Sequence, residues 1–197
     1  MRETELAQSL ADAGLKYLGM ADDSAPLMPP NLASFANSTA AEGRAVGVGL
    51  ENGLPDLQAT ANSEWYRLAM NEGLFPADDP EFLLSVSAGD PESPRVLWWA
   101  RVALEAEWDL AGAGAASRVT GNGWGHPEFV MLSVDGDVVA RGSTGEEYTD
   151  LVFLRDPHRI QSIRNFGADM AHWPDLPKAT RDAVARWLEH TACPGPS

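Results

Sequence analysis

Apolar residues recur at the 3.6-residue period of an amphipathic helix in three stretches of the chain. The first spans residues 4–19. The others span 61–72, which Gly73 ends, and 178–191, which follows Pro177. The inward-facing positions that we expect on these three helices are Leu6, Leu10, Ala13, Tyr17, Trp65, Leu68, Met70, Val184, Trp187 and Leu188.

Two stretches in the middle of the chain have a less decided pattern. The pattern of residues 80–110 is ambiguous, and Pro80 and Glu81 are compatible with the start of a short helix through Leu84. Residues 95–108 fit either a helix or a long strand. We predict a helix for 95–108, because Ala, Leu, Glu and Arg dominate this stretch and favour helices.

The pattern becomes strand-like in the C-terminal half. Residues 128–143 are two apolar runs joined by Asp135-Gly136, a dipeptide typical of a tight hairpin turn. Residues 147–156 read as a third strand and residues 159–166 as a fourth. Helices followed by an antiparallel sheet and a C-terminal helix indicate the α+β class.

Residues 21–62 are rich in Pro, Gly, Asn, Ser and Ala and show no clear period. Structureless stretches of this length are uncommon inside compact domains, so we expect a peripheral wrap or lid. The chain therefore divides into an N-terminal helix with this wrap (1–60), an α+β domain (61–175), and a C-terminal helix and tail (176–197).

The charge balance is strongly acidic. The 197 residues include 14 Lys and Arg against 29 Asp and Glu, for a formal charge of −15. This surface would repel phosphate backbones, so we expect no nucleic-acid binding. The acidity serves either solubility alone or the recognition of a basic partner.

The single cysteine, Cys193, has no internal disulfide partner. Residues 1–18 carry acids where a signal peptide needs a basic region. No apolar run approaches the roughly 18 residues of a membrane-spanning helix. We therefore expect a cytoplasmic protein that binds no membrane.

Motifs for cofactor or metal chemistry are missing from the sequence. The glycines of residues 121–129 do not form a phosphate-binding loop, and Ser143 does not lie in a hydrolase elbow. We therefore predict no cofactor and no metal. The residues that lack metal-ligand spacing with one another are His126, His158, His172, His190 and Cys193.

A carboxylate in an apolar strand is the strongest sign of chemistry. Asp150 lies among apolar residues in 147–156, on the same face as Tyr148. Burial would raise the pKa of Asp150 and make it a general acid or base near neutral pH. Alternatively, Asp150 is exposed and pairs with Arg141 or Arg164.

A Gly-rich segment precedes the first strand of the hairpin. It carries Trp124 and His126. These two side chains either line the mouth of a pocket or belong to a plain turn.

The strands VDGDVVARG and EEYTDLVFL, followed by RDPHRIQSIRNFGADM, resemble the closing strands of SnoaL-like proteins in the nuclear transport factor 2-like superfamily. The polyketide-cyclase and phenazine-biosynthesis branches look most similar. The resemblance covers about residues 128–170. The positions that carry it are Tyr148, Asp150, Arg164, Asn165, Phe166 and Asp169.

The resemblance implies a curved, cone-like antiparallel sheet whose mouth holds a small organic molecule. It also implies a metal-free homodimer. Asp150 would act as the acid or base, while Tyr148 and Asn165 would orient or polarise a carbonyl group. The residues expected to contact the substrate are Trp124, His126, Arg164 and Asp169.

One departure from the family pattern affects this chemistry. Asn165 stands where the family commonly has Glu, and an amide cannot exchange a proton near neutral pH. Two functions therefore stay open. One is a cofactor-independent acid–base isomerase, cyclase or hydrolase of bacterial secondary metabolism. The other is a non-catalytic acidic protein that binds a macromolecular partner or ligand.

Overall fold

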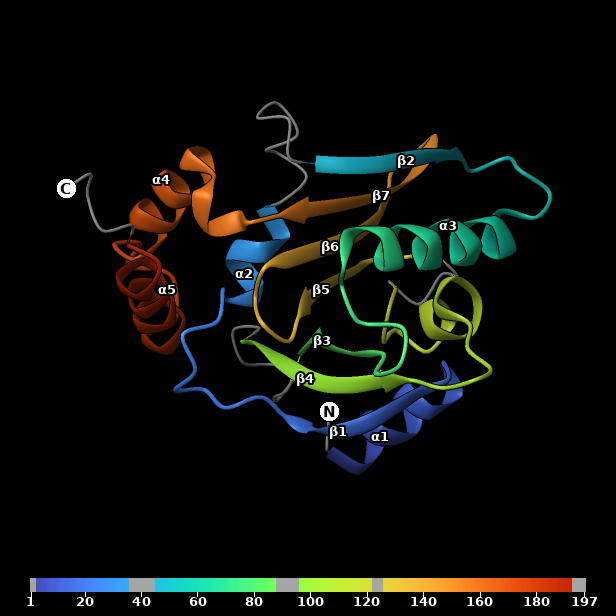
Figure 1. The fold of residues 1–197 in the computed structure, drawn as a ribbon, viewed down its shortest axis with the longest axis horizontal. Coiled ribbons are helices and arrows are strands. Elements are labelled where there is room, and N and C mark those ends of the chain that lie inside the picture. The colour runs from blue at the N-terminus through green and yellow to red at the C-terminus, as the bar shows by residue number, and fades with distance from the viewer. Residues whose placement is uncertain (1–2, 36–44, 88–95, 122–125, 193–197) are drawn as a thin grey trace.

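The computed structural model describes residues 3–35, 45–87, 96–121 and 126–192. Its centre is a seven-stranded antiparallel sheet with the strand order β1-β4-β3-β5-β6-β7-β2 (Figure 1). The elements are α1 (Glu3–Asp12), β1 (Leu15–Met20), α2 (Pro30–Ala33), β2 (Ala45–Glu51), α3 (Leu57–Glu72), β3 (Glu81–Ser87), β4 (Leu97–Leu104), the π-helical turn η2 (Leu110–Gly114), β5 (Phe129–Ser133), β6 (Val138–Thr144), β7 (Tyr148–Arg155), the 3-10 turn η3 (Pro157–Arg159), α4 (Gln161–Met170) and α5 (Lys178–His190).

The α+β class is confirmed, but helices and strands alternate along the chain rather than forming two successive blocks. The first predicted helix, 4–19, is in fact α1 followed by β1. Gly14 separates them with a φ of +71°, and a Cβ at this position would lie 2.1 Å from the carbonyl oxygen of Glu107. Only glycine fits this close turn, so the helix ends there and the chain continues as an edge strand beside β4.

The helices predicted at 80–84 and 95–108 are wrong, because residues 81–87 and 97–104 form the paired strands β3 and β4. Consecutive residues of β4, such as Trp99 and Ala100, are buried on opposite faces of the sheet. A strand that is buried on both faces has a continuous apolar sequence, and periodicity cannot distinguish it from a buried helix.

The hairpin predicted for 128–143 is confirmed as β5 and β6, with Gly136 at a φ of +84° in the turn. The strand predicted for 147–156 is confirmed as β7. The helix predicted for 178–191 is confirmed as α5.

The fourth late strand, predicted for 159–166, is wrong. After η3 the chain forms α4, and its buried residues Ile163, Gly167 and Met170 follow the spacing of one helix face. The last strand that the family resemblance implies for this segment is therefore a helix.

The segment 21–62 is less irregular than expected. It contains α2, β2 and the first turn of α3. All seven residues of β2 pair with β7, from Ala45 opposite Leu154 to Glu51 opposite Tyr148. The sheet therefore crosses the division that we predicted at residue 60.

Both faces of the sheet are packed against helices. One hydrophobic core joins the sheet to α1 and α3 through residues such as Leu10, Trp65 and Phe82. The other joins it to α2, α4 and α5, which contribute residues such as Leu32 and Trp187. Figure 1 shows α4 and α5 at one end of the molecule and α3 alongside the strands.

The end of α3 provides a test of this architecture. Gly73 caps the helix with φ +80° and ψ 36°, and its N–H donates to the carbonyl of Ala69. The substitution Gly73→Ala should lower the free energy of unfolding by about 1 kcal/mol, because a Cβ is disfavoured in the left-handed region. Urea unfolding followed by circular dichroism measures this loss.

Gly53→Ala is the matched control. A Cβ at either position would meet open space, but only Gly73 has a positive φ. An equal loss at both positions would contradict the backbone explanation.

Candidate functional site

A cleft of about 420 Å³ lies where three distant parts of the chain meet. Its walls come from the segment between β1 and α2, from the first residues of β4, and from the first half of α5. The apolar part of the lining includes Leu27, Pro29, Leu97, Trp98 and Trp99. The exposed rim carries Asp22, Asp23, Asp182 and Arg186.

Two hydrogen bonds fix the walls of this cleft. The buried indole N–H of Trp99 donates to the carbonyl oxygen of Met28 at 2.8 Å. Nη2 of Arg186 donates to the carbonyl oxygen of Asp23 at 2.7 Å. The segment between β1 and α2 is therefore tied both to β4 and to α5.

Carboxylates outnumber cations among the residues that line the cleft, while Lys178 and Arg181 also lie near Asp182. Oδ1 of Asp22 accepts from the backbone N–H of Ser24 at 2.8 Å and from its hydroxyl at 2.7 Å. These bonds hold the pKa of Asp22 below its ordinary value. The hydrogen bond from Lys178, at 2.6 Å, likewise lowers the pKa of Asp182.

Asp23 differs from the other two carboxylates. No hydrogen bond or ion pair to its side chain is present in the part of the chain that the structure describes. Three carboxylates and one guanidinium give the lining a formal charge of −2. An apolar floor below an acidic rim suits a ligand group with a cationic end and an apolar stem, as Lys and Arg have.

A second hollow of about 440 Å³ is more polar. Its lining includes Arg118, Glu128 and Arg141. Arg141 already donates to the carbonyl of Ser34 and lies 3.6 Å from a carboxylate oxygen of Glu128. Internal contacts thus engage its guanidinium, although Nε is buried without a partner among the described residues.

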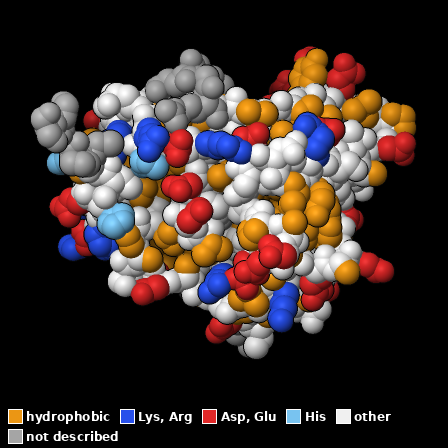
Figure 2. Space-filling model, in the orientation of Figure 1, with side chains coloured by type: hydrophobic (Ala, Val, Ile, Leu, Met, Phe, Trp, Pro, Cys, Tyr) orange, Lys and Arg blue, Asp and Glu red, His pale blue; other side chains and the backbone are white. Residues whose placement is uncertain are grey.

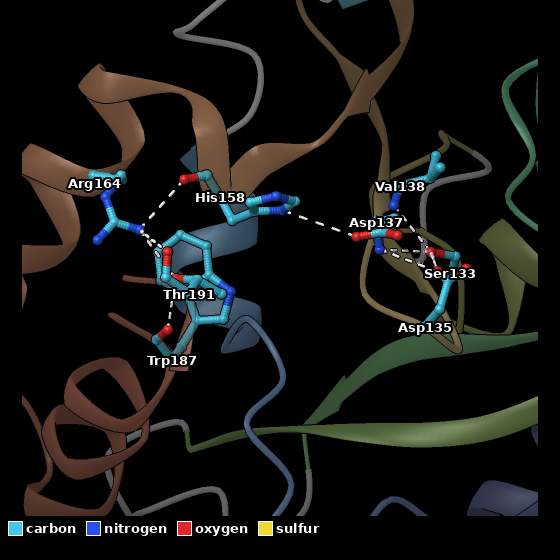
Figure 3. A network of polar contacts seen from close by, with 8 residues as sticks. All are labelled: Ser133, Asp135, Asp137, Val138, His158, Arg164, Trp187 and Thr191. Carbon is cyan, nitrogen blue, oxygen red and sulfur yellow. Dashed lines mark hydrogen bonds and ion pairs between the residues drawn. The ribbon is translucent and has the colours of Figure 1, made fainter. Parts of the chain in front are cut away.

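Two turns at one end of the β6–β7 pair bring together groups that could hold a cation. Ligand atoms of Asp137, Asp156 and His158 all lie within 4.8 Å of one another. Nδ1 of His158 is 3.9 Å from Oδ1 of Asp137 (Figure 3). Two carboxylates and an imidazole suit a divalent cation. The Asp137 side chain is 59% exposed, however, and exposed acidic groups cluster in this way without a cation as well.

The remainder of the network in Figure 3 serves the fold. The hydroxyl of Ser133 accepts from the N–H groups of Asp137 and Val138 at 3.1 and 2.9 Å, which shapes the β5–β6 turn. Nη1 of Arg164 donates to the carbonyl of His158 and to Oγ1 of Thr191, which ties α4 to the end of α5.

The predicted acid–base residues do not form a buried site. Asp150 is exposed, and Tyr148 is 45% exposed. On the neighbouring strands Asp150 lies opposite Gly49 and Ser143. The burial that we expected for Asp150 is absent. No ion pair of Asp150 with Arg141 or Arg164 is found among the described residues.

The other predicted residues lie elsewhere. Arg164, Asn165 and Asp169 are on α4, at the opposite end of the molecule from the beginning of β7 (Figure 1). Asn165 is exposed and accepts from Nε2 of Gln161 at 2.7 Å. Asp169 is also exposed. The chain therefore does not bring Asp150 and Asn165 into one site, because the segment carrying Asn165 is a helix rather than a neighbouring strand.

Of the two residues predicted to contact the substrate in the Gly-rich segment, only His126 can be placed. Trp124 lies outside the described residues. His126 is half-buried, and its Nδ1 is buried without a hydrogen-bond partner in the described parts of the chain. His126 does not line the cleft beside α5.

The chain matches no protein-family model, and searches of curated proteins and of solved structures found no significant match. Within the described ranges, no helix has both the length and the apolar character needed to cross a membrane. Function must therefore be argued from the geometry.

One partly buried carboxylate that the sequence analysis missed has a structural role. Asp109 accepts from the N–H groups of Gly112 and Ala113 at 2.7 and 2.9 Å and from Nδ2 of Asn62 at 2.7 Å. Burial raises the pKa of Asp109, but these hydrogen bonds outweigh it and hold the pKa below the ordinary 3.8. The charged form therefore stabilises η2 against α3.

The substitution Asp109→Asn should cost about 1 kcal/mol of unfolding free energy at neutral pH, after allowance for partial exposure. Because the folded pKa is lowered, this contribution is present above the unfolded pKa and is lost as the pH falls through the folded pKa. The difference from the parent protein should therefore shrink below about pH 4. Urea titrations between neutral and acidic pH measure it. Asp79→Asn, at an exposed position, should show a smaller effect at neutral pH.

Proposed function

We propose that this chain is a non-catalytic binding protein whose cleft receives a basic, partly apolar segment of a partner protein. The observation that carries the proposal is the apolar cleft beneath the exposed carboxylates of Asp22, Asp23 and Asp182. An acidic surface that meets a basic partner was one of the two functions left open by the sequence.

The chemistry of the lining supports binding rather than catalysis. Among the described residues that line the cleft, none is His, Cys, Lys or Glu. The hydroxyl of Ser24 is engaged by Asp22. Both Asp22 and Asp182 have a lowered pKa, which is the opposite of what a general acid needs.

The charge of the whole chain supports the same proposal. A formal charge of −15 attracts basic partners over a distance and repels acidic ones. Figure 2 shows acidic side chains spread over one face, with hydrophobic side chains exposed between them. The negative charge of the protein would then attract a cationic segment towards the cleft. The apolar part of this segment would pack against Leu27, Leu97 and Trp98.

An array of synthetic peptides tests this proposal. The peptides vary in their content of Lys and Arg and, independently, in their content of Leu and Trp. Peptides that carry both kinds of residue should bind, and fluorescence anisotropy of the selected peptides should show weaker binding at higher salt. Equal binding of acidic or uncharged peptides, or no binding by any peptide, would overturn the proposal.

Neutralising the rim should weaken this binding. We expect the double substitution Asp22→Asn and Asp23→Asn to raise the Kd of a selected peptide about tenfold and to reduce its salt dependence. The matched control is Asp78→Asn with Asp79→Asn, another adjacent pair of exposed carboxylates with the same change in net charge. Equal weakening by both pairs would mean that only the overall charge matters.

Blocking the cleft should have a larger effect. Ala179 is exposed and lines the cleft on α5, so Ala179→Arg would add both bulk and an opposing charge. We expect binding of the selected peptide to be lost. Ala168→Arg, on the exposed side of α4, makes the same change elsewhere and should leave binding largely intact.

A further inference from the structure

Among the described residues, no strand pairs with the outer edge of β2. β2 is the last strand of the sheet, and no other described strand lies beyond it (Figure 1). All seven of its residues face β7 in a regular antiparallel register. Its other edge therefore presents the row of backbone groups that a further strand would need.

The register identifies the outward groups. The N–H of Asn52 donates to the carbonyl of Glu147 at 2.8 Å, so this pair is a hydrogen-bonded one. Hydrogen-bonded pairs alternate along an antiparallel ladder. The pairs made by Leu50, Val48 and Val46 with β7 are therefore bonded as well. The residues whose N–H and C=O groups point outward are Ala45, Gly47, Gly49 and Glu51.

These outward residues offer little obstruction to an incoming strand. Two of them, Gly47 and Gly49, are glycines and carry no side chain. β2 contains no proline and no lysine, which commonly protect an edge, and Glu51 is its only charged residue. Val46 is 45% exposed beside this edge.

We propose that a second copy of this chain pairs with β2 in the antiparallel direction, with the two-fold axis at Val48. In this register Gly47 lies opposite Gly49 of the partner, and Ala45 lies opposite Glu51. All outward N–H and C=O groups of both strands then find partners. The sheet continues from one copy into the other.

The charges of β2 are compatible with this register, because Glu51 faces an alanine rather than another carboxylate. The overall charge of −15 on each copy opposes association, however. Added salt should therefore strengthen the dimer, whereas it should weaken binding in the cleft. Pairing through seven residues makes a small interface, so we expect a concentration-dependent equilibrium rather than a permanent dimer.

Cysteine cross-linking tests the register directly. Val48 would face Val48 of the second copy as a non-hydrogen-bonded pair, with Cα atoms about 4.5 Å apart. This separation allows a disulfide. In a Cys193→Ser background, Val48→Cys should form a disulfide-linked dimer of twice the 21.2 kDa chain mass under mild oxidation. Val46→Cys should not, because the two copies of residue 46 would be roughly 13 Å apart.

Analytical ultracentrifugation across a concentration series tests whether the outer edge of β2 is the dimer interface. We expect the parent protein to dimerise more strongly as salt rises, and Val46→Asp to remain monomeric. Leu18→Asp makes the same change on the other edge strand, at a residue that is 37% exposed, and should dimerise like the parent. A parent protein that is monomeric at every salt and protein concentration would overturn the proposal. So would equal cross-linking at positions 46 and 48, or equal loss of dimer in both acidic variants.

Discussion

Strands in the middle of the sheet bury side chains on both faces, because one set of helices packs above the sheet and another below it. Consecutive residues such as Leu83 and Leu84, or Met131 and Leu132, are at most 2% exposed. They belong alternately to the two hydrophobic cores. The centre of the sheet is thus filled by its own side chains, and the apolar cleft forms near an edge instead, where β4, α5 and the segment before α2 meet.

The same constraint explains the position of Asp150. Strand alternation places it on one face with Val152 and Leu154, as the sequence suggests. Burial along this face falls steadily, since Leu154 is fully buried, Val152 is half-buried and Asp150 is exposed. The core that includes α4 and α5 covers the final residues of β7 and leaves its beginning open. Apolar neighbours in the sequence therefore do not decide whether a carboxylate is buried. Its burial depends on whether a helix packs over that part of the strand.

Short sequence motifs for turns and helix ends predicted the corresponding structure correctly. The Asp135-Gly136 hairpin and the helix ended by Gly73 were confirmed, because turn and cap geometry depend on a few neighbouring residues. Segment 95–108 was wrong because its alternatives differ only in tertiary context. For 159–166, the spacing of Ile163, Gly167 and Met170 was a helical signal that the strand interpretation missed. The cleft could not be predicted, because its walls come from three separate segments, residues 21–31, 96–99 and 179–186, and no motif links them.

The two proposed surfaces are compatible with each other. The cleft lies beside β4, next to one edge strand of the sheet, whereas β2 is the strand at the other edge. Pairing through β2 extends the sheet away from the cleft, so each copy in a dimer keeps its cleft open. A dimer would then present two acidic clefts at a fixed separation. Linked sites bind a partner that carries two basic segments far more tightly than a single site does, provided that the segments can span the distance. Salt acts on the two contacts in opposite directions, since it strengthens pairing through β2 and weakens binding in the cleft, so bivalent binding should be strongest at an intermediate ionic strength.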